Sequence, residues 1–131
     1  MHEKLVPLIA ASMITLMPSA MRAEGAVRVL ACNTVRVCDA AGSCELATDE
    51  TRFRMEPQAL DASGASRFAL AYGDVRADMN AMSDVGPFIW NVGTERHALL
   101  VSSETQWLWH RLTLDPAPAA TIAFLECSFE Q

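Results

Sequence analysis

The sequence predicts an all-β fold, a small antiparallel meander that closes fully or partly into a barrel of about eight strands, with a β-sandwich as the alternative. Three observations lead to this prediction. Segments in which apolar and polar residues alternate recur at intervals of roughly ten residues. Turn-forming residues separate these segments, and no amphipathic helix pattern follows residue 23. Four cysteines are spaced so that disulfides can staple such a meander.

Residues 1–23 have the three-part form of a secretory signal peptide. A short polar start ends at Lys4, an uncharged and mostly apolar run covers 5–17, and small residues follow, with cleavage expected after Ala20 or Ala23. An apolar run of about 13 residues is shorter than the roughly 20 that a membrane span needs, although an N-terminal anchor is the alternative. We therefore expect a periplasmic or secreted protein whose residues 24–131 form one domain without a membrane span.

Export determines how the cysteines are read, because thiols that reach an oxidising compartment pair. Cys38 and Cys44 flank the turn-forming stretch 39–43, which favours a bridge between them. Cys32 and Cys127 would then join the first strand to the last. Three connectivities are possible for four cysteines, and the spacing does not decide among them.

The first strands are expected at 26–32 and 34–38, with a bulge or kink at Asn33 between them. After the turn at 39–43 the chain returns at 44–47, which makes a stapled hairpin. Residues 51–56 alternate cleanly and predict a half-buried strand that Pro57 ends.

The stretch 58–65 is the least regular part of the chain. A hairpin follows, with strands at 67–72 and 75–81 around the two-residue turn Gly73–Asp74. Residues 83–87 form another turn. The remaining strands are predicted at 88–91, 97–101, 105–114 and 121–129.

The strand at 105–114 carries apolar residues on both faces. Trp107 and Trp109 share one face, while Leu108, Leu112 and Leu114 share the other. A strand with one solvated face alternates apolar with polar residues instead. We therefore expect one of these faces to be covered, to line a pocket or to contact a partner.

Trp90, Trp107 and Trp109, flanked by His110, are the candidate ligand or partner surface. Tryptophan is enriched in pockets and at the energetic centres of interfaces. The alternative is that the three indoles fill the core of a small barrel.

His97 and His110 lie on consecutive predicted strands and, with Glu95 or Glu104, could hold zinc or copper. A third protein ligand is not evident, so structural histidines are the favoured interpretation. We predict no metal and no cofactor.

Composition and motifs narrow the function. Asp and Glu outnumber Lys and Arg by 16 to 10, giving a net charge of −6, which argues against nucleic-acid binding. The sequence has no nucleophile elbow, zinc-protease, phosphate-loop or dinucleotide motif. Paired cysteines would leave no thiolate for catalysis. We predict that the protein is not an enzyme.

An exported β meander with Cys32 in its first strand and Cys127 in its last resembles the small periplasmic inhibitors of c-type lysozyme. The loop Ser63–Gly64–Ala65 contributes to the resemblance. The resemblance implies that a Ser and a Lys of the inhibitor enter the lysozyme cleft. No Lys follows Lys4 in this chain, so this sequence departs from the family pattern at that point. An acidic inhibitor would suit a basic lysozyme.

The sequence thus predicts an exported β-barrel binding module for an unknown protein or a small apolar ligand. The alternative is a periplasmic inhibitor of a secreted enzyme such as a c-type lysozyme, binding through loops such as Ser63–Gly64 or 83–87.

Overall fold

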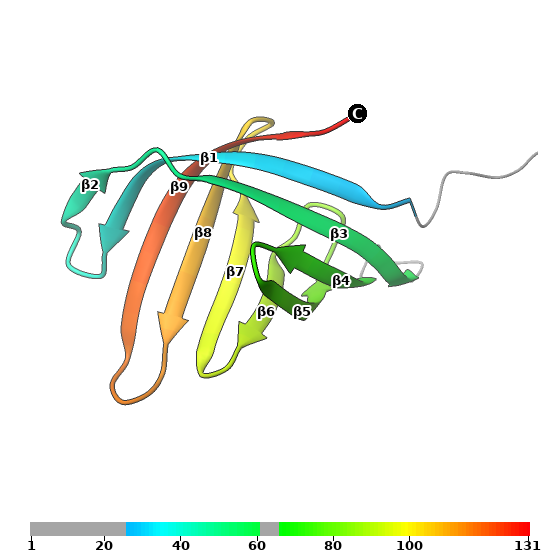
Figure 1. Ribbon diagram of the computed structural model, residues 1–131. Helices are drawn as coiled ribbons and strands as arrows, with labels where there is room; N and C mark the ends of the chain where they lie inside the picture. The colour runs from blue at the N-terminus through cyan, green and yellow to red at the C-terminus, as the bar shows by residue number, and fades with distance from the viewer. Residues whose placement is uncertain (1–25, 61–65) are drawn as a thin grey trace, which may run out of the picture.

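A computed structural model describes residues 26–60 and 66–131 (Figure 1). This part of the chain is entirely β, without helices. Its nine strands are β1 (Arg28–Asp39), β2 (Cys44–Leu46), β3 (Glu50–Leu60), β4 (Ser66–Tyr72), β5 (Val75–Ala81), β6 (Phe88–Val92), β7 (Glu95–Val101), β8 (Gln106–Thr113) and β9 (Ala119–Phe129). The predicted signal peptide and the Ser63–Gly64–Ala65 loop lie outside the described residues, and both remain predictions.

The strands form an antiparallel meander that closes on itself. They are hydrogen-bonded in the order β2-β1-β3-β4-β5-β6-β7-β8-β9, and β1 also pairs with β9. Every one of the nine strands except β2 therefore belongs to the closed wall, which makes an eight-stranded barrel. The predicted all-β barrel is confirmed, and the sandwich alternative is not the fold.

Strand β1 has more neighbours than any other strand. One of its edges pairs with β9 along most of its length, while the other pairs first with β3 and then with β2. The register passes from Thr34–Leu125 to Arg36–Phe124, so Val35 is an extra, bulged residue. The sequence predicted a bulge or kink at Asn33 between two strand segments. The structure has one strand there, with its bulge two residues further on, at Val35. Beyond the bulge, β1 carries the β2 hairpin outside the barrel wall (Figure 1).

Pro57 does not end its strand, contrary to the sequence prediction. Strand β3 continues to Leu60, with a second register shift between Pro57 and Ala59. The ladder between β3 and β1 stops at Met55, so Pro57 pairs only with β4. Because no strand pairs with Pro57 on the β1 side, the N–H that proline lacks is not needed for a hydrogen bond there. The predicted β4–β5 hairpin is confirmed, with Tyr72 paired to Val75 around the turn.

The structure contains two disulfides, Cys32–Cys127 and Cys38–Cys44, which confirms the predicted pairing. Each joins residues that face each other directly in a ladder, the first in β1–β9 and the second in β1–β2. The first links positions 95 residues apart and fastens the strands that close the barrel.

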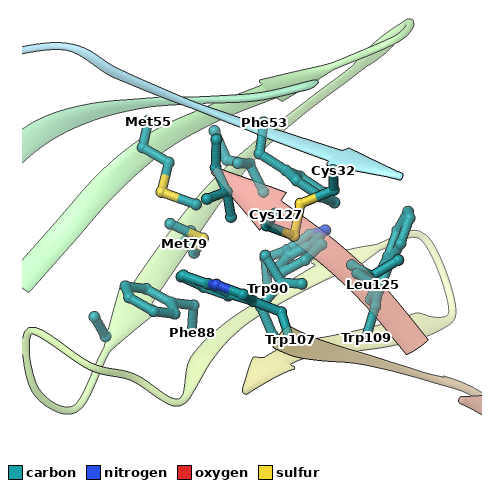
Figure 2. Packing of buried hydrophobic residues seen from close by; sticks show 14 of the residues in the cluster. Cys32, Phe53, Met55, Met79, Phe88, Trp90, Trp107, Trp109, Leu125 and Cys127 are labelled. Carbon is teal, nitrogen blue, oxygen red and sulfur yellow. A yellow bond between two sulfur atoms is a disulfide. The ribbon is translucent and has the colours of Figure 1, made fainter. Parts of the chain in front are cut away.

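Side chains fill the barrel interior (Figure 2). Phe53 lies among the aromatic rings, with centroids 5.1 Å from both Tyr72 and Trp109 and 6.2 Å from Trp90. The Cys32–Cys127 disulfide and Met79 lie in the same core. The inward positions of the eight wall strands thus form one apolar core.

Candidate functional site

The three tryptophans point inward and belong to the core (Figure 2). Trp90 is 1% exposed, Trp107 5% and Trp109 4%. The hypothesis of a ligand or partner surface at these tryptophans requires at least one indole to be accessible to solvent. The burial of all three side chains therefore removes its main support. Of the four residues proposed for this surface, His110 lies on the outer face of the barrel, and Trp107, although buried, is among the residues that line the groove described below.

His97 and His110 lie on opposite sides of the barrel wall. In the β7–β8 ladder His97 faces Arg111, and His110 faces Ala98, one position along. His97 is buried, whereas His110 is half-buried on the outer face. The two imidazoles therefore do not share a site. Among residues 26–60 and 66–131, no three His, Cys, Asp or Glu side chains gather as metal ligands would.

His97 is a structural residue inside the wall. Its Nδ1 accepts a hydrogen bond from the Trp109 indole, its Nε2 lies 3.0 Å from a Glu95 carboxylate oxygen, and its ring stacks on Trp90. Burial lowers the pKa of His97, while Glu95 acts in the opposite direction and Arg111 in the same one. These contacts suit the neutral imidazole with its proton on Nε2.

The outer face of β6–β9 is unusually apolar for a solvated surface. One row runs across the strands through directly paired residues, from Leu100 to Leu108 to Phe124 to Arg36. Leu100 and Phe124 are 38% and 41% exposed, so they meet solvent even though Leu108 between them is half-buried.

A second row lies beside the first. It runs from Ile89 through Ala98, His110 and Ile122 to Cys38, again through direct pairs in each ladder. We call the two rows together the outer apolar face. The sequence indicated this face through Leu108 on the predicted strand 105–114, and β8 is indeed apolar on both sides.

The opposite side of the barrel has a different character. The outer surface of β3–β5 carries charged groups between small residues, and it includes the ion pair of Arg54 with Glu56. Arg76 and Asp78 line the same shallow hollow. The polarity expected of a solvated barrel surface is therefore present on β3–β5 and absent from the centre of β6–β9.

A groove of about 460 Å³ lies at one end of the outer apolar face. Leu108 and Phe124 line it from β8 and β9, and Val35 and the Cys38–Cys44 disulfide line it from the hairpin. Polar groups also line the groove, namely those of Ser102, Gln106, Arg36 and Glu126. The bulge makes the groove possible, because it places the exposed Val35 side chain at this point.

A second exposed apolar feature is the loop between β5 and β6. Met82 and Val85 are 68% and 62% exposed. The loop is braced internally, because the Ser83 hydroxyl donates to the Gly86 carbonyl at 2.7 Å and accepts from the Val85 amide. This loop is the 83–87 turn that the sequence predicted.

Sequence reasoning missed several residues of these surfaces. Leu100, Ile122 and Phe124 were included in predicted strands, but their outward side was not recognised. The alternation of side chains along a strand could have identified Ile122 and Phe124, because both lie on one side of the predicted strand 121–129 and Leu125 lies on the other. Val35 could not have been found in this way, because its exposure results from the bulge.

The described residues contain no helix long and apolar enough to cross a membrane. No protein-family model matches the chain, and no curated protein or solved structure shows significant similarity to it.

Proposed function

We propose that this protein is an exported binding module that holds a small apolar ligand in the groove between the stapled hairpin and the outer side of β8 and β9. One observation carries the proposal: Leu108 and Phe124 continue an apolar surface into a groove of about 460 Å³ on the outside of a barrel whose interior is already filled. Ligand pockets are commonly about 300–1,000 Å³ and mostly apolar, with a few polar groups.

The groove has both kinds of group. Its apolar floor would remove the ligand from water, while Gln106, Ser102, Arg36 and Glu126 would orient a polar substituent. The Cys38–Cys44 bridge holds the hairpin that forms one wall, so less conformational freedom is lost when a ligand binds. The two disulfides are compatible with an oxidising compartment, which supports export. No catalytic step is part of this proposal.

The test is a titration of the protein with Nile red, a neutral apolar dye whose emission rises in apolar surroundings. Removing the Phe124 ring by Phe124→Ser takes away floor contacts, and we expect the affinity for the dye to fall at least about tenfold. Leu114→Ser is the matched control, because Leu114 is similarly exposed, at 46% against 41%, and does not line the groove. Equal dye binding by the two variants, or none by the unmodified protein, would refute the proposal.

Inhibition of a secreted enzyme is a second candidate, favoured by the braced loop at 82–87. Met82 and Val85 are large, exposed apolar side chains on a loop with internal hydrogen bonds, which is suited to insertion into a cleft. A c-type lysozyme, being basic, would complement the net charge of −6.

The measurement is lysis of bacterial cell walls by the lysozyme with and without this protein. Inhibition that Val85→Asp abolishes would support this function, and full lysozyme activity at micromolar protein would exclude it.

A further inference from the structure

The outer apolar face extends well beyond the groove. Ile89, Leu100 and Ile122 belong to its two rows but do not line the groove. The rows cross five neighbouring strands, β6 to β9 and β1, which lie about 4.8 Å apart, so the face is about 19 Å wide. With side chains included it covers roughly 300 Å², the size of the largest apolar patches on monomeric proteins, which are often functional.

No Asp, Glu, Lys or Arg side chain lies at the centre of this face. Its rows are made of aliphatic and aromatic side chains together with His110 and the Cys38–Cys44 disulfide. Ionised groups stand at the margins, with Arg36 at the end of one row and Glu126 beside Gln106. A partner that covers this face therefore needs an uncharged, apolar centre of its own.

We infer that a second copy of this chain covers the outer apolar face, forming a two-fold symmetric dimer. A two-fold interface brings the same patch of both copies together, so an uncharged apolar centre meets its own equivalent without like-charge contact. A standard interface buries about 800 Å² per partner around an apolar core with a polar rim. The outer apolar face would supply that core, and the hairpin and the loop at 102–105 would supply the rim.

Charge gives this dimer a recognisable signature. Two copies that each carry a net charge of −6 repel one another, and added salt screens that repulsion. The dimer should therefore tighten as salt rises. Binding of an oppositely charged protein to the same face would weaken instead, because salt screens attraction as well.

The experiment is sedimentation equilibrium of the exported, oxidised protein over a range of concentrations in low and high salt. We expect a monomer–dimer equilibrium whose dissociation constant falls with added salt. Leu100→Glu and Ile122→Glu each place a carboxylate on the face, and each should raise the dissociation constant at least about tenfold. Leu114→Glu is the matched control, since Leu114 is also exposed, at 46% against 38% for Leu100, and belongs to neither row of the outer apolar face.

A monomer at every concentration would overturn the inference, as would a dimer that both face variants leave unchanged or that high salt dissociates. Near-ultraviolet circular dichroism of the buried indoles would verify that each variant is folded. Nile red titration of Leu100→Glu separates this inference from the proposed function, because Leu100 does not line the groove. Dye binding by an unmodified protein that stays monomeric at every concentration would reject the dimer alone and leave the groove proposal standing.

Discussion

The Trp109 indole nitrogen donates a hydrogen bond to Nδ1 of His97 over 3.0 Å, and both side chains are buried. Within the barrel wall this bond pairs two polar atoms that would otherwise lose their contacts with water. It also specifies the protonation state, because Nδ1 can accept only while it carries no proton. A protonated imidazole would direct N–H groups at the indole N–H and at Glu95 together.

The first prediction follows from this bond. Burial holds the pKa of folded His97 below its ordinary 6.5, so the unfolded chain binds the proton more readily. The stabilisation from neutral His97 is complete above 6.5 and is lost as the pH falls from 6.5 toward the lowered pKa of the folded state. Urea unfolding measured at pH 7.5 and pH 5 should therefore show lower stability at the acidic value.

A non-titrating substitution isolates this effect. His97→Asn keeps a side-chain oxygen that can accept from Trp109, and it should reduce the pH dependence between these two values. His110→Asn, on the outer face, is the matched control, because it leaves the hydrogen bond between Trp109 and His97 in place. If both variants kept the pH dependence of the unmodified protein, His97 would not be its source.

The second prediction concerns Gly86, which has a φ of +87° and precedes Phe88 in the core. A Cβ added there would lie 2.9 Å from a Phe88 ring carbon, so Gly86→Ala should cost about 2–4 kcal/mol of unfolding free energy through strain and displaced packing. Gly42→Ala is the control, because Gly42 has a φ of +89° with nothing within 4 Å of the added Cβ. Equal losses in urea unfolding would mean that the contact with Phe88 contributes nothing.

The third prediction separates the roles of the two disulfides. Replacing Cys32 and Cys127 by alanine frees a loop of 95 residues and should cost about 5 kcal/mol, whereas the Cys38–Cys44 pair encloses only 6 and should cost about 2 kcal/mol. The affinity for Nile red should fall more when Cys38 and Cys44 are replaced than when Cys32 and Cys127 are replaced, because only the Cys38–Cys44 bridge lies in the wall of the groove. Thermal unfolding and dye titration of the two double variants measure both quantities.

The fourth prediction concerns tryptophan emission. All three indoles are at most 5% exposed, so the oxidised protein should emit at short wavelength and be quenched weakly by acrylamide. Reduction in denaturant should shift the emission to the red and make it easily quenched. Red-shifted, strongly quenched emission from the native protein would contradict the packing in Figure 2.

The fold could be predicted largely from alternation, turn residues and cysteine spacing, since these are local signals. The path around Pro57 could not, because a proline is tolerated in a strand only where a neighbouring ladder has already ended. That condition depends on where β1 begins, which is a property of the assembled sheet.

The site was harder to predict than the fold. Alternation places Trp107 and Leu108 on opposite faces of one strand, but both faces are apolar, so the pattern does not say which points inward. Closure of the barrel decides it, because the bulky indoles of Trp90 and Trp109 fill the interior and Leu108 is left outside.

The pairing of β1 with β9 also sets the order in which the molecule can be assembled. The wall closes only when β1 meets β9, so completion requires every strand from β1 to β9 to be present. Contacts between such distant positions make folding slow, on the order of milliseconds to seconds. If the chain crosses a membrane unfolded, as its predicted signal peptide implies, Cys127 arrives 95 residues after Cys32. Until then Cys32 has no native partner, and the outer apolar face exists only as open, incompletely paired strands.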